Sequence, residues 1–358
     1  LQFLTFFVCT VQAVNRYADL IRASVASASN DHRLGANEAP PAIISVFLGD
    51  SMTKVLNNIE AGIEGTESGV KEVYNLLSKI PDLEKDNTDR NRTSPFAFTG
   101  NKFEIRAVGS SMNCAGPMTI MNTIMGRQLM DFKVAVDALV ASGTDKEAAI
   151  LTVIKGYITD SKKIRFEGDN YSDAWKEEAA SRGLSNTPNT PDALKAYVSS
   201  SATELLTSSG VFTERELHAH YDVMNDSYVL KLQIESRTLG EMVVNHILPA
   251  AVEYQSDLAS NIASLKAIGL PESAFKAQLE IVTKISENIN GMKDAVEAMT
   301  EARKVANENE TAEEKAHAYC HGVKPLMDEI RTCADRLEYL VDDRAWPLVK
   351  YRELMFVR

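Results

Sequence analysis

The sequence predicts an α+β fold that is helical for most of its length, with a few short strands followed by a large helical bundle. Two observations indicate this. Before about residue 117, expected helices are interspersed with a short apolar run and a segment of alternating apolar and polar residues, which are typical of strands. After Pro117 they recur every three or four residues over long stretches, which is typical of amphipathic helices in a bundle.

The composition limits the function classes. The chain has 358 residues, enough for two domains. Its 50 acidic and 38 basic residues give a net charge of −12, which argues against general nucleic-acid binding. No apolar run reaches the roughly 18 residues of a membrane span. The four cysteines are scattered and form no CxxC pair, so we expect reduced thiols and a cytoplasmic protein.

The first third of the chain predicts a small α/β arrangement. Helical spacing predicts a buried amphipathic helix over 3–28, and the apolar run 43–48 predicts a buried strand. A short helix is expected over 51–63. Strands over 95–98 and 102–108 should pair across the turn Thr99-Gly100-Asn101.

The remaining two thirds predict helices. Thr144–Glu147 and Thr213–Glu216 have the capping-box pattern of helix starts. Thr190-Pro191 predicts a helix with Thr190 as its cap and proline at the first helical position. Residues 213–267 predict one long helix bent at Pro249. Further helices are expected around 125–139, 173–182, 275–299 and 323–341.

The candidate chemistry lies in the segment DRNRTSPFAFTGNKFEIR. Side chains alternate faces along a strand, so Lys102, Glu104 and Arg106 should point the same way. Arg90 and Arg92 are expected in the turn that precedes the strands, where they would add two more cations. One carboxylate between two cations can hold a metal ion and anionic oxygens, although the same pattern also suits a surface ladder of ion pairs.

This segment resembles the type III glutamine synthetases when it is taken together with HRLGANEAPPAI and the C-terminal RAWPLVKYRELMFVR. The resemblance implies ATP-dependent formation of glutamine from glutamate and ammonia through γ-glutamyl phosphate. It also implies that residues 1–120 form the C-terminal part of the catalytic domain. Residues 121–358 would form the helical C-terminal extension.

The resemblance implies a role for four residues of the strand segment. Arg92 would contact the phosphates and stabilise the transferred group, and Lys102 would contact the nucleotide. Glu104 would be a ligand of Mg²⁺ or Mn²⁺, which prefer carboxylate oxygen. Arg106 would bind the glutamate carboxylate or the acyl phosphate.

The earlier loop carries two further residues of this kind. By resemblance Arg33 would bind substrate glutamate, and Glu38 would help to bind and deprotonate ammonium while shielding the intermediate from water. Without the resemblance, Glu38 would be interpreted as a loop acid near a backbone N–H. Ala97 departs from the family, because the shorter classes carry a second arginine there.

The remaining ligands of such a site are expected upstream of the first motif. No histidine precedes His32, and Asp19 is the one acidic residue among the first 30. The chain also starts with Leu1. We therefore expect a C-terminal portion of a larger enzyme that carries part of a site. The family forms homo-oligomers, so the intact protein is expected to do so too.

Other hypotheses for the function of the chain and of its histidines remain open. The chain could be a non-catalytic helical assembly module whose partial nucleotide and metal site is inert, or a nucleotide-binding regulator of another ligase. His317, Cys320 and His321 share a helical turn and could bind zinc, although exposed helix residues are the favoured reading. His218 and His220 are expected to be surface or core histidines.

Overall fold

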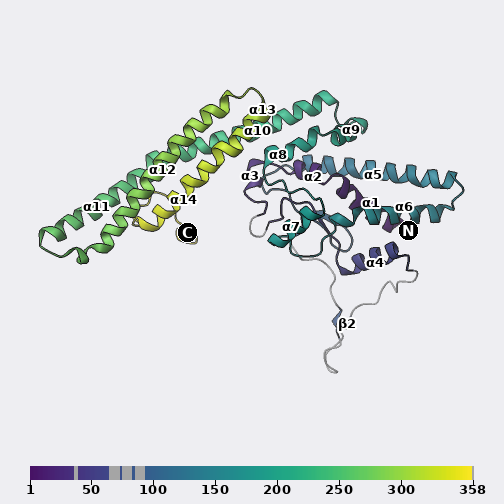
Figure 1. The fold of residues 1–358 in the computed structure, drawn as a ribbon, viewed down its shortest axis with the longest axis horizontal. Helices are drawn as coiled ribbons and strands as arrows, with labels where there is room; N and C mark the ends of the chain where they lie inside the picture. Colours follow the sequence, from purple (N-terminus) through teal and green to yellow (C-terminus); the bar gives the residue numbers. More distant parts are fainter. Residues whose placement is uncertain (36–38, 64–72, 75–82, 85–92, 357–358) are drawn as a thin grey trace. The chain divides into compact units, whose positions relative to one another are not determined.

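The computed structural model describes residues 1–35, 39–63, 73–74, 83–84 and 93–356, and these form two compact units, Leu1–Tyr221 and Asp222–Arg358 (Figure 1). The described residues are mostly helical with a few short strands, so the predicted fold class is confirmed. No described helix combines the length and the apolar composition that a membrane crossing requires.

The first unit holds all the described strands together with helices α1 to α9. Its helices are α1 (Gln2–Arg16), α2 (Ala18–Ser24), α3 (Ala28–Asp31), α4 (Asp50–Ala61), α5 (Ala115–Ala141), α6 (Lys146–Asp160), α7 (Asp173–Ser181), α8 (Thr190–Leu194) and α9 (Ser200–Ser208), with 3₁₀ turns η1 (Ser161–Ile164) and η2 (Lys195–Val198). Its strands are β1 (Val46–Phe47), β2 (Val73–Tyr74), β3 (Leu83–Glu84), β4 (Phe96–Phe98) and β5 (Phe103–Ile105).

Three strands form a small sheet in the order β1-β4-β5. β4 and β5 are antiparallel, which confirms the predicted hairpin, and β1 runs parallel to β4. The expected strand over 43–48 is shortened to β1, although Ile43 and Ile44 are buried as predicted. Beyond β1, Arg165 extends the sheet by a single parallel bridge to Val46. β2 and β3 form a separate antiparallel pair.

The predicted helix over 3–28 is divided in two. α1 ends at Arg16 because Tyr17 leaves the helical conformation, with φ −123° and ψ 28°, and α2 continues from Ala18. Both helices pack against α5. At the break Arg16 donates to Asp131 of α5 over 2.6 Å. The division therefore coincides with a tertiary contact that the helical periodicity does not encode.

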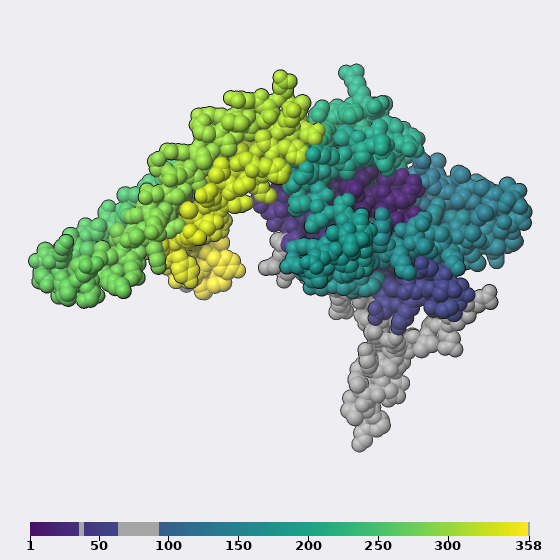
Figure 2. Space-filling view, in the orientation of Figure 1, coloured from purple at the N-terminus to yellow at the C-terminus, as the bar shows by residue number. Residues whose placement is uncertain are grey.

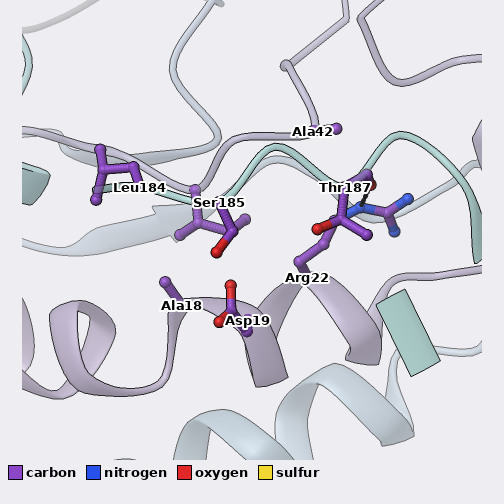
Figure 3. Close-up of a pocket in the computed structure, with 8 residues that line it drawn as sticks. Ala18, Asp19, Arg22, Ala42, Leu184, Ser185 and Thr187 are labelled. Carbon is purple, nitrogen blue, oxygen red and sulfur yellow. Dashed lines mark hydrogen bonds between the residues drawn. The ribbon is translucent and has the colours of Figure 1, made fainter. Parts of the chain in front are cut away.

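A buried ion pair ties α2 to the end of α3. Arg22 is 2% exposed, and its Nη2 lies 3.4 Å from Oδ1 of Asp31. Its Nε donates to the carbonyl of Thr187 over 2.9 Å, the contact drawn in Figure 3. Asp31 also accepts from the backbone N–H and the hydroxyl of Thr190, each over 2.8 Å. The pair thus binds the segment before α8 to the N-terminal helices.

Helix starts follow the sequence with one-residue shifts. The predicted capping box of Thr213 and Glu216 is confirmed, since each side chain accepts from the other's backbone N–H. The prediction for Thr144 is wrong, because Asp145 is the N-cap of α6. α8 has Asn189 as its N-cap, so Pro191 lies one position further into the helix than predicted. Asp and Asn cap as well as Thr, so adjacent candidates compete.

The second unit consists of long helices, and α11, α12 and α14 run side by side (Figure 1). Its elements are α10 (Glu214–Met242), which begins in the first unit, η3 (Val243–Ile247), α11 (Leu248–Ala267), η4 (Glu272–Ala274), α12 (Lys276–Glu308), α13 (Ala312–Ala318), η5 (Tyr319–Val323), α14 (Lys324–Leu340) and α15 (Tyr351–Leu354). The predicted stripes lie on α12 and α14.

The predicted bend at Pro249 is a π-helical turn, η3, placed just before the proline. Proline has no N–H to donate, and its ring collides with the carbonyl four residues earlier, at Asn245. A wider turn relieves that collision. The same arrangement recurs at η5, which precedes Pro325.

The division into domains at residue 120 remains a prediction. The boundary between the two compact units falls elsewhere in the sequence, between residues 221 and 222.

Removing the buried cation should destabilise the first unit. In Arg22→Met the carboxylate of Asp31 stays buried without its charge partner, so the free energy of unfolding should fall by about 3–5 kcal/mol. Urea unfolding followed by the fluorescence of Trp175, in a Trp346→Phe background, measures this change.

The matched control is Lys133→Met, which removes an exposed pair with Asp137 on α5. Its cost should stay below about 1 kcal/mol. A loss of that small size in Arg22→Met would contradict the structural role given to the buried pair.

Candidate functional site

The row of charges predicted on the second hairpin strand is present. Nζ of Lys102 lies 3.2 Å from Oε1 of Glu104, and Nη2 of Arg106 lies 3.3 Å from Oε2. The Glu104 side chain is 36% exposed, so the row faces solvent at the edge of the sheet. The three side chains share one face, as strand alternation predicts.

Aromatic packing fixes the other face of this strand. The ring of Phe103 lies 5.2–5.3 Å from those of Phe96, Phe98 and Phe7, the last from α1. At the turn, the N–H of Thr99 donates to the carbonyl of Lys102, and Gly100 takes φ 96°, which favours glycine. The apolar face therefore holds the charged face outward.

Arg33 is brought to the end of the same strand. Its Nη2 donates to the backbone carbonyl of Arg106 over 3.3 Å. The residue follows α3, where its backbone N–H donates to the carbonyl of Asn30. Two segments predicted to contribute to one site, more than 70 residues apart, thus meet in the structure. Lys102 and Arg106 bond to Glu104, and Arg33 lies beside the backbone of Arg106.

The sequence analysis missed the residue that joins these two segments. Asn30 is 1% exposed, and its Nδ2 donates to the carbonyls of Val25 and Ala107 over 2.7 and 3.0 Å. A side chain at Gly109 would approach its Oδ1 to 3.2 Å, so the close approach favours glycine there. Ser27 accepts from the N–H of Asn30, so an S-x-x-N cap was the one available signal.

The electrostatics of the row keep Glu104 charged. The hydrogen bond from Lys102 is the largest effect and lowers the pKa of the Glu104 carboxyl from its ordinary value. Burial opposes this and is the second largest effect on the pKa, and the hydrogen bond from Arg106 again lowers the pKa. A carboxylate that stays ionised to lower pH suits metal or cation binding.

Two predicted site residues, Glu38 and Arg92, lie outside the described residues, as does Arg90. Their described neighbours are held firmly. The N–H of Gly35 donates to the carbonyl of Pro40 over 3.0 Å, which closes the base of the segment that contains Glu38. Thr93, next to Arg92, accepts from Asn170 over 3.4 Å.

The row by itself does not fit a complete metal centre. Glu104 has the oxygen donors that Mg²⁺ and Mn²⁺ prefer, so the donor type fits. In the part of the chain that the structure describes, however, no three His, Cys, Asp or Glu side chains gather closely enough to hold an ion. Glu104 can therefore supply one ligand of a shared centre.

Ala97 explains one departure noted in the sequence. It is fully buried on β4, where it pairs directly with Glu104. Paired residues of antiparallel strands face the same side, so an arginine here would share the face of Glu104 and would have to displace the atoms that now bury Ala97. The absence of a second arginine is thus consistent with the local packing.

The histidine candidates give no site. The rings of His317 and His321 lie nearly parallel 5.8 Å apart at the turn η5, and Cys320 beside them is buried. His220 packs between Tyr197 and Phe212, and burial lowers the pKa of its imidazole. His220 is partly buried, in line with the expectation of a surface or core histidine.

Residues 149–266 match the family model described as the glutamine synthetase C-terminal domain. The chain is 46% identical over 363 residues to a glutamine synthetase of Bacteroides fragilis, covering 99% of this chain and 50% of the relative. It is 36% identical to a type-3 glutamine synthetase of Dictyostelium discoideum, covering 100% and 49%. A glutamine synthetase of Butyrivibrio fibrisolvens is also 36% identical, covering 99% and 50%. The chain thus spans about half the length of the curated relatives it matches.

The charge row makes a prediction about pH. In Lys102→Met the pKa of Glu104 should rise toward its ordinary value, because the largest stabilising contact of the carboxylate is gone. Carbon NMR of labelled glutamate side chains, followed through a pH titration, measures this shift. Since the folded pKa is the lower one, the stabilisation by this contact is present above the unfolded pKa and is lost as pH falls through the folded pKa.

The control is Lys133→Met, because that lysine pairs with Asp137 on α5. It should leave the titration of Glu104 unchanged. A wild-type Glu104 that already titrates at the ordinary glutamate pKa would show that the row does not form in solution.

Proposed function

We propose that this chain contributes part of the active site of a type III glutamine synthetase, a glutamate–ammonia ligase that uses ATP and forms γ-glutamyl phosphate. One observation carries the proposal. Lys102 and Arg106 flank Glu104, and Arg33 bonds to the backbone carbonyl of Arg106, in a chain similar over its whole length to glutamine synthetases. The activity is that of the similar glutamine synthetases, and the geometry supplies residues that can serve it.

The charge distribution suits phosphoryl transfer. That reaction depends mainly on positioning and on neutralising the charge of the phosphate oxygens. In the proposal Lys102 binds the nucleotide phosphates, and Arg92 stabilises the transferred group. Arg106 offers a planar pair of donors to the carboxylate or the acyl phosphate, a geometry that lysine does not reproduce.

Glutamate binding is proposed for Arg33. Its guanidinium already bonds to the carbonyl of Arg106, so its position is set relative to the charge row. A substrate carboxylate bound there would approach the same edge of the sheet. Glu38 is proposed to receive a proton from ammonium and to help to exclude water, because acyl phosphates hydrolyse when water reaches them.

Glu104 is proposed to supply one oxygen ligand to Mg²⁺ or Mn²⁺. When bound, the ion would neutralise phosphate charge. Lys102 and Arg106 now bond to the Glu104 oxygens, so metal binding would exchange these ion pairs for metal coordination. The other ligands are proposed to come from residues beyond those described.

The wider features of the proposal follow the family. Residues 1–120 are proposed to be the C-terminal part of the catalytic domain, and residues 121–358 a helical extension. A homo-oligomer in the cytoplasm is proposed for the intact protein. Exposed apolar side chains on α5, such as Met130 and Val134, are compatible with such contacts.

A second candidate function is a helical assembly module whose partial site is inert. One observation favours it: the described residues contain no group of three metal-binding side chains. The two functions differ in what happens when the row is altered, because an inert row can be changed without affecting any turnover.

Neutralising the proposed metal ligand tests this directly. In the protein expressed from its complete gene, Glu104→Ala should lower kcat for ATP- and ammonium-dependent glutamine formation by at least about 100-fold. The control Glu301→Ala removes an exposed glutamate that pairs with Lys304, and its kcat should match wild type. Full activity in Glu104→Ala would reject the metal role and favour the inert module.

Substrate binding gives a separate test. Arg33→Lys keeps the charge but loses the planar donor pair, so KM for glutamate should rise about tenfold, with a smaller change in KM for ATP. Steady-state kinetics with each substrate varied measures both values. Equal changes in both constants would contradict a glutamate-specific role.

A further inference from the structure

A basic pocket lies at the opposite edge of the sheet from the charge row. Its volume is about 580 Å³, and it is bounded by α4, the end of α6 with η1, and the segment after η1. Figure 2 shows α4 in dark blue against the teal residues of that region. The cations that line it are Lys162, Lys163, Arg165 and Arg182, with Asp160 and Glu167 as acids.

Arg165 is the central feature of this pocket. It is 8% exposed, and two of its guanidinium nitrogens, Nε and Nη1, have no hydrogen-bond partner among the described residues. Its third nitrogen, Nη2, makes a long bond of 3.4 Å to the carbonyl of Ile158. A buried guanidinium normally has its donors paired, since an unpaired buried charge is costly.

Backbone contacts fix the position of Arg165 at the edge of the sheet. Arg165 bridges to Val46 of β1, and the N–H of Phe166 donates to the carbonyl of Val46 over 3.0 Å. The carbonyl of Arg165 accepts from Arg182 over 2.7 Å. The Arg182 guanidinium also lies beside the rings of Phe166 and Trp175. The Arg165 backbone is therefore held by β1 and by Arg182, and its side chain is buried.

Glu167 and Glu60 are engaged by other contacts, whereas Asp160, exposed at the end of α6, remains as an acid of the lining. Glu167 accepts from the N–H groups of Leu48 and Gly49 and from the hydroxyl of Thr53, so it caps α4. Glu60 lies 3.0 Å from Lys162. Burial is the largest effect on Arg165 and lowers its pKa, while Glu60 and Glu167 only partly offset this.

Two cations thus remain without a direct anionic partner. Lys163 is exposed and has no ion-pair partner within the described ranges, and Arg165 has none at contact distance. Arg182 pairs with Glu178. A phosphate monoester carries a charge of about −1.5 to −2 at neutral pH, which matches the two cations. The pocket exceeds one phosphate in size and leaves room for a small organic group.

We propose that this pocket binds a phosphate group, free or carried on a small organic molecule, between Arg165 and Lys163. The site is separate from the proposed active site. It has its own cations, and it lies beyond β1, whereas the charge row lies on β5. Binding would complete the hydrogen bonding of a buried guanidinium and hold α4 against the end of α6.

Calorimetric titration of the protein expressed from its complete gene tests the proposal, with inorganic phosphate and ribose 5-phosphate as probes at constant ionic strength. Lys163→Gln should weaken phosphate binding at this site about tenfold, and Arg165→Gln should abolish it. The control Lys176→Gln removes an exposed lysine that pairs with Asp173, and it should bind as wild type does. Tighter binding of ribose 5-phosphate would identify an organic phosphate, and equal binding free phosphate.

Lys102→Gln separates this site from the proposed active site. It should leave the binding that depends on Lys163 intact, whatever its effect on glutamine formation. Equal phosphate affinity in wild type, Lys163→Gln and Lys163→Glu would overturn the proposal, as would no binding beyond that of chloride. If Arg165→Gln does not fold, the two Lys163 variants decide the outcome, because that side chain is exposed.

Discussion

The buried ion pair between Arg22 and Asp31 is the contact on which the geometry of the candidate site depends. The pair is made at the end of α3, and two nearby residues, Asn30 and Arg33, position the end of the hairpin strand. Asn30 bonds to the carbonyl of Ala107, and Arg33 bonds to that of Arg106. A buried ion pair is costly to form unless further hydrogen bonds complete it, and here Thr187 and Thr190 supply them. One short turn therefore joins three segments that are distant in sequence.

This arrangement explains how one edge of a three-stranded sheet can present charged side chains in a fixed geometry. A hairpin alone is marginally stable in water and needs packing on one face. The aromatic cluster around Phe103 supplies that packing, and Asn30 holds the strand end against the N-terminal helices. The charged face is therefore not needed to hold the strand in place. Its ion pairs are largely exposed and contribute little to stability, so they can be exchanged for ligand contacts.

Sequence patterns predicted those features of the site that depend only on residues close in sequence. The period-two alternation of Lys102, Glu104 and Arg106 required only strand geometry, and the structure has the three side chains in contact. The break at Tyr17 and the bonds of Asn30 could not be predicted in this way, because both depend on partners more than 70 residues away. The π-helical turn before Pro249 lies between these cases. The proline predicted an irregularity in the helix. The form of that irregularity depends on how the helix avoids the clash between the proline ring and the carbonyl four residues earlier.

The sheet also determines how independent the two charged sites can be. Arg165, Val46, Phe96 and Ile105 lie in one cross-strand line, which spans about 14 Å at the usual strand spacing. Glu104 is the neighbour of Ile105, so by alternation its side chain faces the other way from that line. This separation exceeds the screening length of about 8 Å for exposed charges at physiological salt, but the buried Arg165 is screened less. The backbone register of β1, β4 and β5 is a second route by which an anion at Arg165 can influence the charge row. A one-residue slip in that register would reverse the faces of the row, so the sheet can transmit only small displacements.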